Sequence, residues 1–225
     1  MIDGIIFDFD GIIIDSEGAI YQSWQELFHN YGVQIDTTHW ASVVGILDGE
    51  RGYIRELEAQ AGQRLDWESM SRVRQQRERE LVTSLPLMPG VRSYLEDARR
   101  LGIKLGMASS SPREWVNGHL TRLGLIDFFD DIRTCEDVFL VKPEPELYLA
   151  VLAGLGLAPN QAIALEDSPP GVTAAKRAGL FCTAVPTELT RRLPLDHADL
   201  LLNSLADLTL GEMIQKVNGS RNGIG

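Results

Sequence analysis

The sequence predicts an α/β fold in which an open parallel sheet is covered by helices on both faces and a helical segment is inserted after the first strand. Short apolar runs alternate with longer amphipathic stretches along most of the 225 residues, which is typical of successive strand–helix–strand units. Several runs are apolar throughout, as expected of parallel strands covered on both faces. Residues 16–84 break the alternation, because they contain helical patterns and no convincing strand.

The predicted strands are short and alternate with helical patterns. They are Ile2–Phe7, Ile103–Ala108, Ile132–Cys135, Ala162–Leu165, Phe181–Val185 and Leu200–Leu202. The helices predicted among them are Val91–Leu101, Glu114–Leu123, Glu146–Leu155 and Val172–Ala178. A glycine follows each of these helices, as is common at helix C-termini. The stretch Ser111-Pro112-Arg113-Glu114 is predicted to be a capping box that begins the second helix.

The segment 16–84 is predicted to be a separate helical domain. Its helical patterns are Ala19–Tyr31, Tyr53–Ala61 and Glu68–Leu81. The stretch Leu85–Gly90, with two prolines and a glycine, marks its end. We therefore predict an α/β core domain formed by 1–15 and 85–217, an inserted helical domain, 16–84, and a flexible tail, 218–225, which is rich in Gly and Asn.

The composition restricts the classes of partner. Lys and Arg total 21 and Asp and Glu total 32, so the formal net charge is 21 − 32 = −11. This charge argues against nucleic acid or an anionic membrane as the main partner, but not against a small phosphorylated substrate, which is bound locally by a metal ion, a lysine and helix N-termini. We find no signal-peptide pattern and no apolar stretch long enough to cross a bilayer. We interpret Cys135 and Cys182 as reduced thiols and expect a cytoplasmic monomer.

Acidic residues stand at the ends of two predicted strands. Asp8 and Asp10 follow the apolar run Gly4–Phe7, and Glu166 and Asp167 follow Ala162–Leu165. Side chains two residues apart on an extended chain point to the same side, so the first pair can face one point. Crowded carboxylates repel each other unless a cation lies between them, and an oxygen-rich site that is open to phosphate suits Mg²⁺.

Hydroxyl and amino groups follow two other apolar runs. Ser109, Ser110 and Ser111 come after Ile103–Ala108, at the start of a predicted helix, where hydroxyls and free backbone N–H groups can bind phosphate. Lys142 follows another apolar run and can neutralise phosphate oxygens. Ligand sites of open α/β sheets lie beyond the carboxyl ends of the strands, so we expect these residues and the four acidic ones to meet at one edge.

Together these residues resemble the four motifs of the haloacid dehalogenase-like hydrolase superfamily, in particular its phosphatases and β-phosphoglucomutase-like members with a helical cap. The stretch Asp8–Glu17 resembles the first motif, with Ile12 where Thr or Val is common. Ser109 matches the second motif, Lys142 the third, and Glu166-Asp167 the fourth. The resemblance covers nearly the whole chain. It implies a three-layer Rossmann-like core with the helical insert as a cap domain.

The resemblance also implies roles for these residues. Asp8 would attack the substrate phosphorus to give an aspartyl-phosphate, and Asp10 would protonate the leaving alcohol and then take a proton from water. The expected Mg²⁺ ligands are Asp8, the backbone carbonyl of Asp10, Asp167 and Glu166. The residues expected to contact the phosphoryl group are Gly11, Ser109, Ser110 and Lys142. The relatives imply a sugar phosphate as the substrate class.

Two alternatives to a phosphatase remain open from the sequence. The mutases of the family carry a histidine in the first cap helix, whereas Gly18–Tyr21 contains none and the nearest histidine is His29. Arg51, in the candidate specificity loop Gly45–Gly52, is a candidate substrate contact but is displaced from the position of the mutase arginine. These differences favour hydrolysis over phosphate transfer within a sugar. A non-catalytic phospho-ligand-binding or receiver-like module is the second alternative, and the large helical insert disfavours it.

Overall fold

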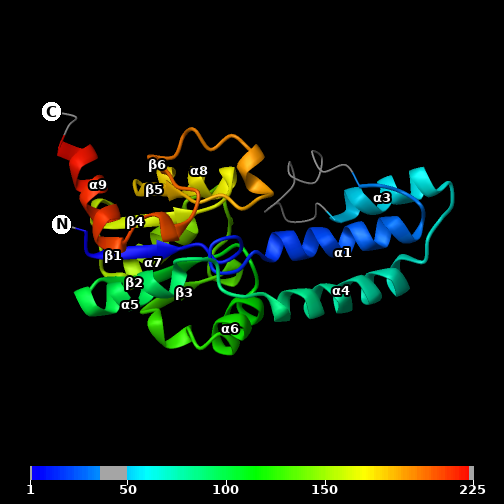
Figure 1. The fold of residues 1–225 in the computed structure, drawn as a ribbon, viewed down its shortest axis with the longest axis horizontal. Coiled ribbons are helices and arrows are strands. Elements are labelled where there is room, and N and C mark those ends of the chain that lie inside the picture. Colours follow the sequence, from blue (N-terminus) through cyan, green and yellow to red (C-terminus); the bar gives the residue numbers. More distant parts are fainter. Residues whose placement is uncertain (1, 36–49, 223–225) are drawn as a thin grey trace. The chain divides into compact units, whose positions relative to one another are not determined.

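The computed structural model describes residues 2–35 and 50–222 (Figure 1). The chain divides into two compact units. Met1–Ile14 and Leu87–Gly225 form the first, here called the core unit, and Asp15–Pro86 form the second, the helical unit. None of the helices within the described ranges is long and apolar enough to cross a membrane.

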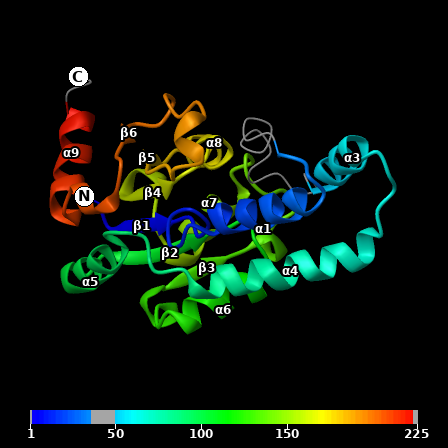
Figure 2. The same cartoon turned by 45° about the vertical axis from the view of Figure 1, so that its right-hand side comes forward.

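The core unit is built on a parallel sheet. Within the described residues it has six strands: β1 (Gly4–Phe7), β2 (Lys104–Ala108), β3 (Asp131–Arg133), β4 (Ala162–Glu166), β5 (Phe181–Ala184) and β6 (Leu200–Leu201). Their order across the sheet is β3-β2-β1-β4-β5-β6, which can be followed from bottom to top in Figure 2. Every pair is parallel, and Phe7 pairs with both Met107 and Leu165. The carboxyl ends of β1, β2 and β4 therefore lie at one level, as the α/β prediction requires.

Helices cover both faces of this sheet. They are α5 (Val91–Leu101), α6 (Arg113–Arg122), α7 (Glu146–Leu155), α8 (Pro169–Arg177) and α9 (Leu210–Asn222). One apolar cluster contains buried residues of α7 and α8 together with Ile6, Ala164 and Cys182 of the strands. The side chain of Thr183, which points to the opposite face, contacts Met213 of α9. The three-layer α/β architecture expected from the sequence is confirmed.

The sequence signals at the ends of some core helices need correction. The predicted capping box at Ser111 does not form: Pro112 is the N-cap residue of α6 and has no side chain that can cap the helix. Helix α9 was not predicted, and it extends through 218–222 into the segment that we expected to be a flexible tail. The sequence contained a signal for this helix, since Thr209 and Glu212 have the spacing of a capping box. In the structure the Glu212 carboxylate accepts from the backbone N–H of Thr209, and the Thr209 hydroxyl accepts from the backbone N–H of Glu212.

The helical unit consists, in its described part, of α1 (Ser16–Asn30), α3 (Glu50–Ala61) and α4 (Trp67–Ser84). Its core is aromatic: Trp24 of α1 is completely buried and stacks on Trp67 of α4 at 5.7 Å between ring centroids. The Tyr53 ring of α3 lies 5.4 Å from that of Trp24, so all three helices meet at this tryptophan. The side chain of Arg51 and residues 45–49 of the candidate specificity loop lie outside the described part of the chain.

Candidate active site

Three carboxylates meet at the carboxyl ends of β1 and β4. Asp8 follows β1, where its N–H donates to the carbonyl of Leu165 at 2.9 Å and so continues the sheet ladder. Glu166 is the last residue of β4 and Asp167 comes next. One oxygen of each of the three carboxylates lies within 4.8 Å of the others, and all three side chains are buried. Two acidic segments that are far apart in the sequence thus form one cluster, because adjacent parallel strands end side by side.

The ammonium group of Lys142 lies between two of these carboxylates. Its Nζ is 2.6 Å from Asp8 Oδ1 and 2.6 Å from Glu166 Oε1. The hydroxyl of Tyr148 also donates to Glu166 Oε1, and the Tyr148 ring lies 5.3 Å from Nζ. Burial lowers the pKa of Lys142, but the charges of Asp8 and Glu166 outweigh that effect, so the pKa is raised and the lysine stays charged.

The protonation of Asp8 depends on the surrounding charge. Its pKa is raised to about 8: burial is the largest cause and the negative charges of Glu166 and Asp10 act in the same direction, while Lys142 opposes them. Lys142 pairs with two of the three carboxylates, Asp8 and Glu166, so two negative charges share this one ammonium group. A divalent cation would stabilise the ionised carboxylates and reverse the upward shift of the Asp8 pKa.

The donor set fits a hard divalent cation. It consists of carboxylate oxygens, which are the ligands that Mg²⁺ prefers. Oxygen Oε2 of Glu166 is buried, and no group among the described residues donates a hydrogen bond to it. Burying such an oxygen is costly unless a cation or donor compensates it. The carboxylate of Asp10 is not part of this cluster within the described residues, which leaves its backbone carbonyl as the expected contribution.

Gly11 and Thr190 hold the Asp167 side of the cluster. A Cβ atom at Gly11 would lie 2.2 Å from Asp167 Oδ2, and the φ angle of Gly11 is +82°. Only glycine adopts this conformation without strain and leaves room for the carboxylate. The hydroxyl of Thr190 donates to Asp167 Oδ2 at 3.3 Å from the other side. The glycine is therefore required by backbone geometry and by the close approach of Asp167.

The serines lie where β2 ends and α6 begins. Ser109 is completely buried, and its Oγ accepts from the N–H of Ser111 at 3.0 Å. The Oγ of Ser110 is buried and has no hydrogen-bond partner among the described residues. Both hydroxyls precede a helix N-terminus, which favours anions. This arrangement suits the oxygens of a phosphoryl group.

Asp10 is held by two donors from the α6 region. The hydroxyl of Ser111 donates to Asp10 Oδ2 at 2.5 Å, and the indole N–H of Trp115 donates to Oδ1 at 3.1 Å. The ring of His119 lies against that of Trp115, at 4.5 Å between centroids. The side chain of Ser111, which we expected to cap the helix, thus contacts the candidate acid–base residue.

The structure brings together the predicted residues Asp8, Glu166, Asp167 and Lys142, with Gly11 against Asp167. Three contacting side chains were missed as site residues: Trp115, Tyr148 and Thr190. Ser111 was considered as a helix cap and a phosphate-binding hydroxyl, but not as a partner of Asp10. For Trp115 the available signal was its place in the first turn of the helix that follows the serines. Tyr148 and Thr190 gave none, because each fits its own segment equally well as a core or turn residue.

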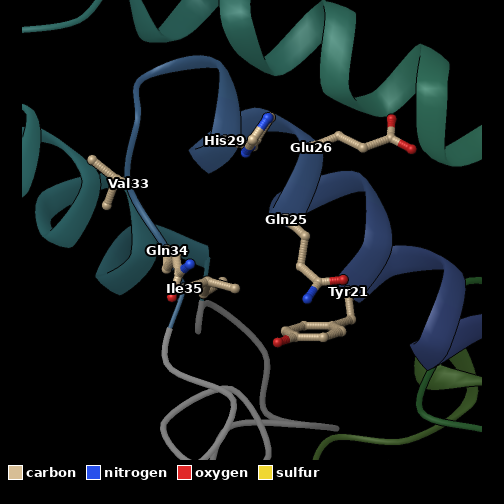
Figure 3. A pocket seen from close by; sticks show the side chains of 7 residues that line it. All are labelled: Tyr21, Gln25, Glu26, His29, Val33, Gln34 and Ile35. Atoms are coloured by element: carbon tan, nitrogen blue, oxygen red, sulfur yellow. The ribbon is translucent and has the colours of Figure 1, made fainter.

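A separate cavity lies within the helical unit. It has a volume of about 510 Å³ and is lined by residues of α1 and the segment that follows it (Figure 3). The lining residues are Tyr21, Gln25, Glu26, His29, Val33, Gln34 and Ile35. The carboxylate of Glu26 is already paired with Arg77, at 2.8 Å. None of the predicted catalytic residues lines this cavity, so the carboxylate cluster of the core unit is the candidate active site.

Comparisons with known proteins agree with the motifs. The family model of haloacid dehalogenase-like hydrolases matches residues 5–185. YhcW of Bacillus subtilis (strain 168), whose name assigns it to the phosphatases, is 41% identical over 97% of this chain and 99% of its own. A phosphorylated carbohydrates phosphatase of Thermotoga maritima is 31% identical over 80% of this chain and 82% of its own. The crystal structure of β-phosphoglucomutase from Clostridium difficile is 28% identical, covers 98% of this chain and 99% of its own, and superposes with a TM-score of 0.73.

Proposed function

The chain belongs to the haloacid dehalogenase-like hydrolases, and from that premise we propose that it hydrolyses small sugar phosphates with Mg²⁺, through an aspartyl-phosphate on Asp8. That it is a phosphatase of phosphorylated substrates follows from its relatives. The metal, the intermediate and the substrate class are the proposal. The observation that carries it is the buried cluster of Asp8, Glu166 and Asp167 with Lys142 between two of the carboxylates.

In the first half-reaction the Asp8 carboxylate is the nucleophile. A carboxylate oxygen attacks phosphorus in line, the bond from phosphorus to the leaving oxygen breaks, and the phosphoryl group is transferred to Asp8. Asp10 donates a proton to the leaving oxygen, so that an alcohol departs instead of an alkoxide. Lys142, 2.6 Å from Asp8, compensates negative charge at the nucleophile. Ser109 and Ser110 bind the phosphoryl oxygens at the start of α6.

In the second half-reaction water attacks the phosphorus of the aspartyl-phosphate. Asp10, now deprotonated, accepts a proton from that water, and the bond between phosphorus and the Asp8 oxygen breaks. Inorganic phosphate leaves, Asp8 is regenerated as a carboxylate, and Asp10 carries the proton needed for the next cycle. The two steps therefore balance without any redox partner.

The proposed metal ligands are Asp8, Asp167 and Glu166, with the carbonyl of Asp10. When bound, Mg²⁺ supplies charge compensation for the phosphoryl oxygens and for the clustered carboxylates. The carboxylate donors, the uncompensated Oε2 of Glu166 and the raised pKa of Asp8 support this assignment.

Hydrolysis is proposed over phosphate transfer within a sugar because the first helix of the helical unit lacks a histidine near its start. Helix α1 has Gly18, Ala19, Ile20 and Tyr21 in its first turns. A mutase must return the phosphoryl group to a bound sugar, which requires additional groups that hold the intermediate. Sugar phosphates are proposed because a similar phosphatase from Thermotoga maritima is named for phosphorylated carbohydrates.

The test is phosphate release from a panel of phosphorylated sugars, polyols and nucleotides, with Mg²⁺ and with a chelator. Conversion of glucose 1-phosphate to glucose 6-phosphate is followed in the same samples. We expect Mg²⁺-dependent phosphate release without isomer conversion. Asp8→Asn should lower turnover by more than about a thousandfold, because an amide of nearly the same shape is a poor nucleophile.

The variant also provides the control for folding. Lys142 keeps its second carboxylate partner, Glu166, in Asp8→Asn, so the circular dichroism spectrum should be unchanged. Conversion of glucose 1-phosphate to glucose 6-phosphate by the wild type would instead indicate a mutase, which transfers phosphate within a sugar. Substantial turnover by pure Asp8→Asn protein would refute the nucleophile.

A further inference from the structure

The carboxylate of Asp10 accepts hydrogen bonds from two side chains that are distant from it in the sequence. Ser111 Oγ donates to Oδ2 and Trp115 Nε1 donates to Oδ1, at 2.5 and 3.1 Å. Each oxygen thus has its own donor, and the two donors approach from one helix start. Two directed hydrogen bonds fix the plane of a carboxyl group, whereas a single bond leaves it free to rotate.

The donors themselves are fixed to the core unit. The first turn of α6 is tied to the 3₁₀ turn Cys135–Asp137: the N–H of Arg113 donates to both oxygens of Glu136 at 3.1 Å, and its guanidinium pairs with Asp137 at 2.6 Å. The indole ring of Trp115 is packed edge-to-face against His119. The two donors therefore form a preorganised pair, which is what accurate placement of a reacting group requires.

We propose that Ser111 and Trp115 are positioning residues that orient the Asp10 carboxyl group for proton transfer to the leaving oxygen. The start of α6 and the residue before its cap would then contribute to acid–base catalysis through two side chains that do not touch the substrate. The inference rests on the proposed function, because it assigns Asp10 as the general acid. A purely structural role, in which Asp10 only fastens α6 to the loop after β1, predicts a different kinetic result.

The difference follows from the chemistry of the leaving group. When the bond from phosphorus to a sugar oxygen breaks, the basic oxygen needs the Asp10 proton. When para-nitrophenyl phosphate is the substrate, the phenolate is stable and leaves without it. Misplacing Asp10 should therefore slow phosphoryl transfer from a sugar phosphate and spare phosphoryl transfer from para-nitrophenyl phosphate.

The experiment measures both reactions on the full-length protein with Mg²⁺. The variants are Trp115→Phe, which keeps an aromatic ring and removes the N–H donor, and Ser111→Ala, which removes the hydroxyl. For each we would measure kcat and KM with the best sugar phosphate of the panel, and the burst of para-nitrophenolate that accompanies formation of the aspartyl-phosphate. We expect kcat for the sugar phosphate to fall about 10- to 100-fold, a part of the full effect of general acid catalysis, with KM nearly unchanged and the burst rate within about threefold of the wild type.

Two matched variants control for changes in packing. Ser111→Thr keeps the hydroxyl and should retain most of the turnover that Ser111→Ala loses. His119→Phe keeps a ring against Trp115 and leaves both donors to Asp10 in place, so it should leave the ratio of the two rates unchanged. The positioning role would be overturned if Trp115→Phe and Ser111→Ala lost activity equally on the sugar phosphate and on para-nitrophenyl phosphate, or if neither variant lost activity. Turnover by the wild type would still support the phosphatase in that case. Absence of sugar phosphate turnover in the wild type would overturn both.

Discussion

At the scale of single residues, the site depends on charges that are buried but paired. Glu166 is completely buried, a position that an isolated carboxylate does not tolerate. Lys142 and the Tyr148 hydroxyl compensate one of its oxygens. The same ammonium group contacts Asp8, so it links the proposed nucleophile to the acidic pair that follows β4. Removing Lys142 would leave these two buried carboxylates without the counter-charge that it supplies.

His119 gives a prediction about pH at this scale. It is half-buried beside Trp115, and burial lowers its pKa below the usual 6.5, with the nearby Arg122 charge acting in the same direction and Asp10 opposing. Because the pKa is lower in the folded than in the unfolded protein, the folded state disfavours the charged ring. The contribution of His119 to stability is present above its unfolded pKa and is lost as the pH falls through its folded pKa.

The measurement is an NMR titration of the His119 ring protons, with assignment from the spectrum of His119→Phe. We expect a midpoint below 6.5, and we expect His119→Phe to lose less stability than the wild type as the pH is lowered through this range. A midpoint at or above the usual histidine value would contradict the burial argument.

At the scale of elements, the site is made by the ends of strands and the starts of helices. Strands β1, β2 and β4 end at one level and deliver Asp8, Ser109 and the acidic pair Glu166-Asp167. Helix α8 begins so close to the last strand residue that a Cβ at Gly171 would lie 1.8 Å from Glu166 Oε2. The two prolines that precede this glycine begin the helix, and the glycine leaves the space that the carboxylate occupies.

Gly171→Ala therefore tests the packing of α8 against the site. Glu166 cannot move aside easily, because Lys142 and Tyr148 hold it in a fully buried position. We expect the free energy of unfolding to fall by about 1–3 kcal/mol, the usual effect of overpacking, and phosphatase activity to fall with it. Urea denaturation measures the first and phosphate release the second.

Gly118→Ala on α6 is the matched control. It makes the same substitution in a helix of the core unit, but no atom lies within 4 Å of the new Cβ. Alanine favours the helix over glycine, so stability should rise by up to about 1 kcal/mol. If both variants behaved alike, the close approach at Gly171 would not be the determining factor.

At the scale of the whole molecule, the chain is one α/β unit interrupted by a helical one. The N–H of Met88 donates to the carbonyl of Ile13 at 2.9 Å. The chain therefore leaves the core unit and returns to it at neighbouring points. The carboxylates that are proposed to bind Mg²⁺, and Lys142, all belong to the core unit. The sequence of an insert between adjacent points can change, and the substrate preference can change with it, while the catalytic groups of the core unit stay in place.

This division predicts that the core unit binds the metal by itself. A variant in which 15–86 are replaced by a short Gly-Ser linker should fold, because the two ends to be joined are already hydrogen-bonded neighbours. Mg²⁺ at about 100 times its dissociation constant should stabilise it by about 2.7 kcal/mol, measured as a rise in Tm. We expect turnover of sugar phosphates to be lost. Asp167→Asn in the same variant should remove the Mg²⁺ effect, and an unfolded or Mg²⁺-insensitive core would contradict the prediction.

The sequence by itself determined the α/β class, the helical insert and the placement of the acidic residues. The bounds predicted for Val91–Leu101 and Glu146–Leu155 are those of α5 and α7. These features are local: apolar runs define strands, periodicity defines helices, and parallel strands must end at a common edge. The carboxylates of Asp8 and Asp167 could therefore be placed near each other from the order of strands and acidic residues along the chain.

Only the tertiary structure decided which groups contact these carboxylates. The donors to Asp10 are 101 and 105 residues away, and the lysine that pairs with Asp8 is 134 residues away. Such contacts depend on how each helix packs against the sheet and on the rotamer that each side chain adopts there. Ser111 illustrates the limit, because its local sequence predicts a helix cap, whereas packing of α6 beside the loop after β1 directs its hydroxyl to Asp10. A hydrogen bond between distant segments forms where the fold brings donor and acceptor together, and local sequence does not encode that distance.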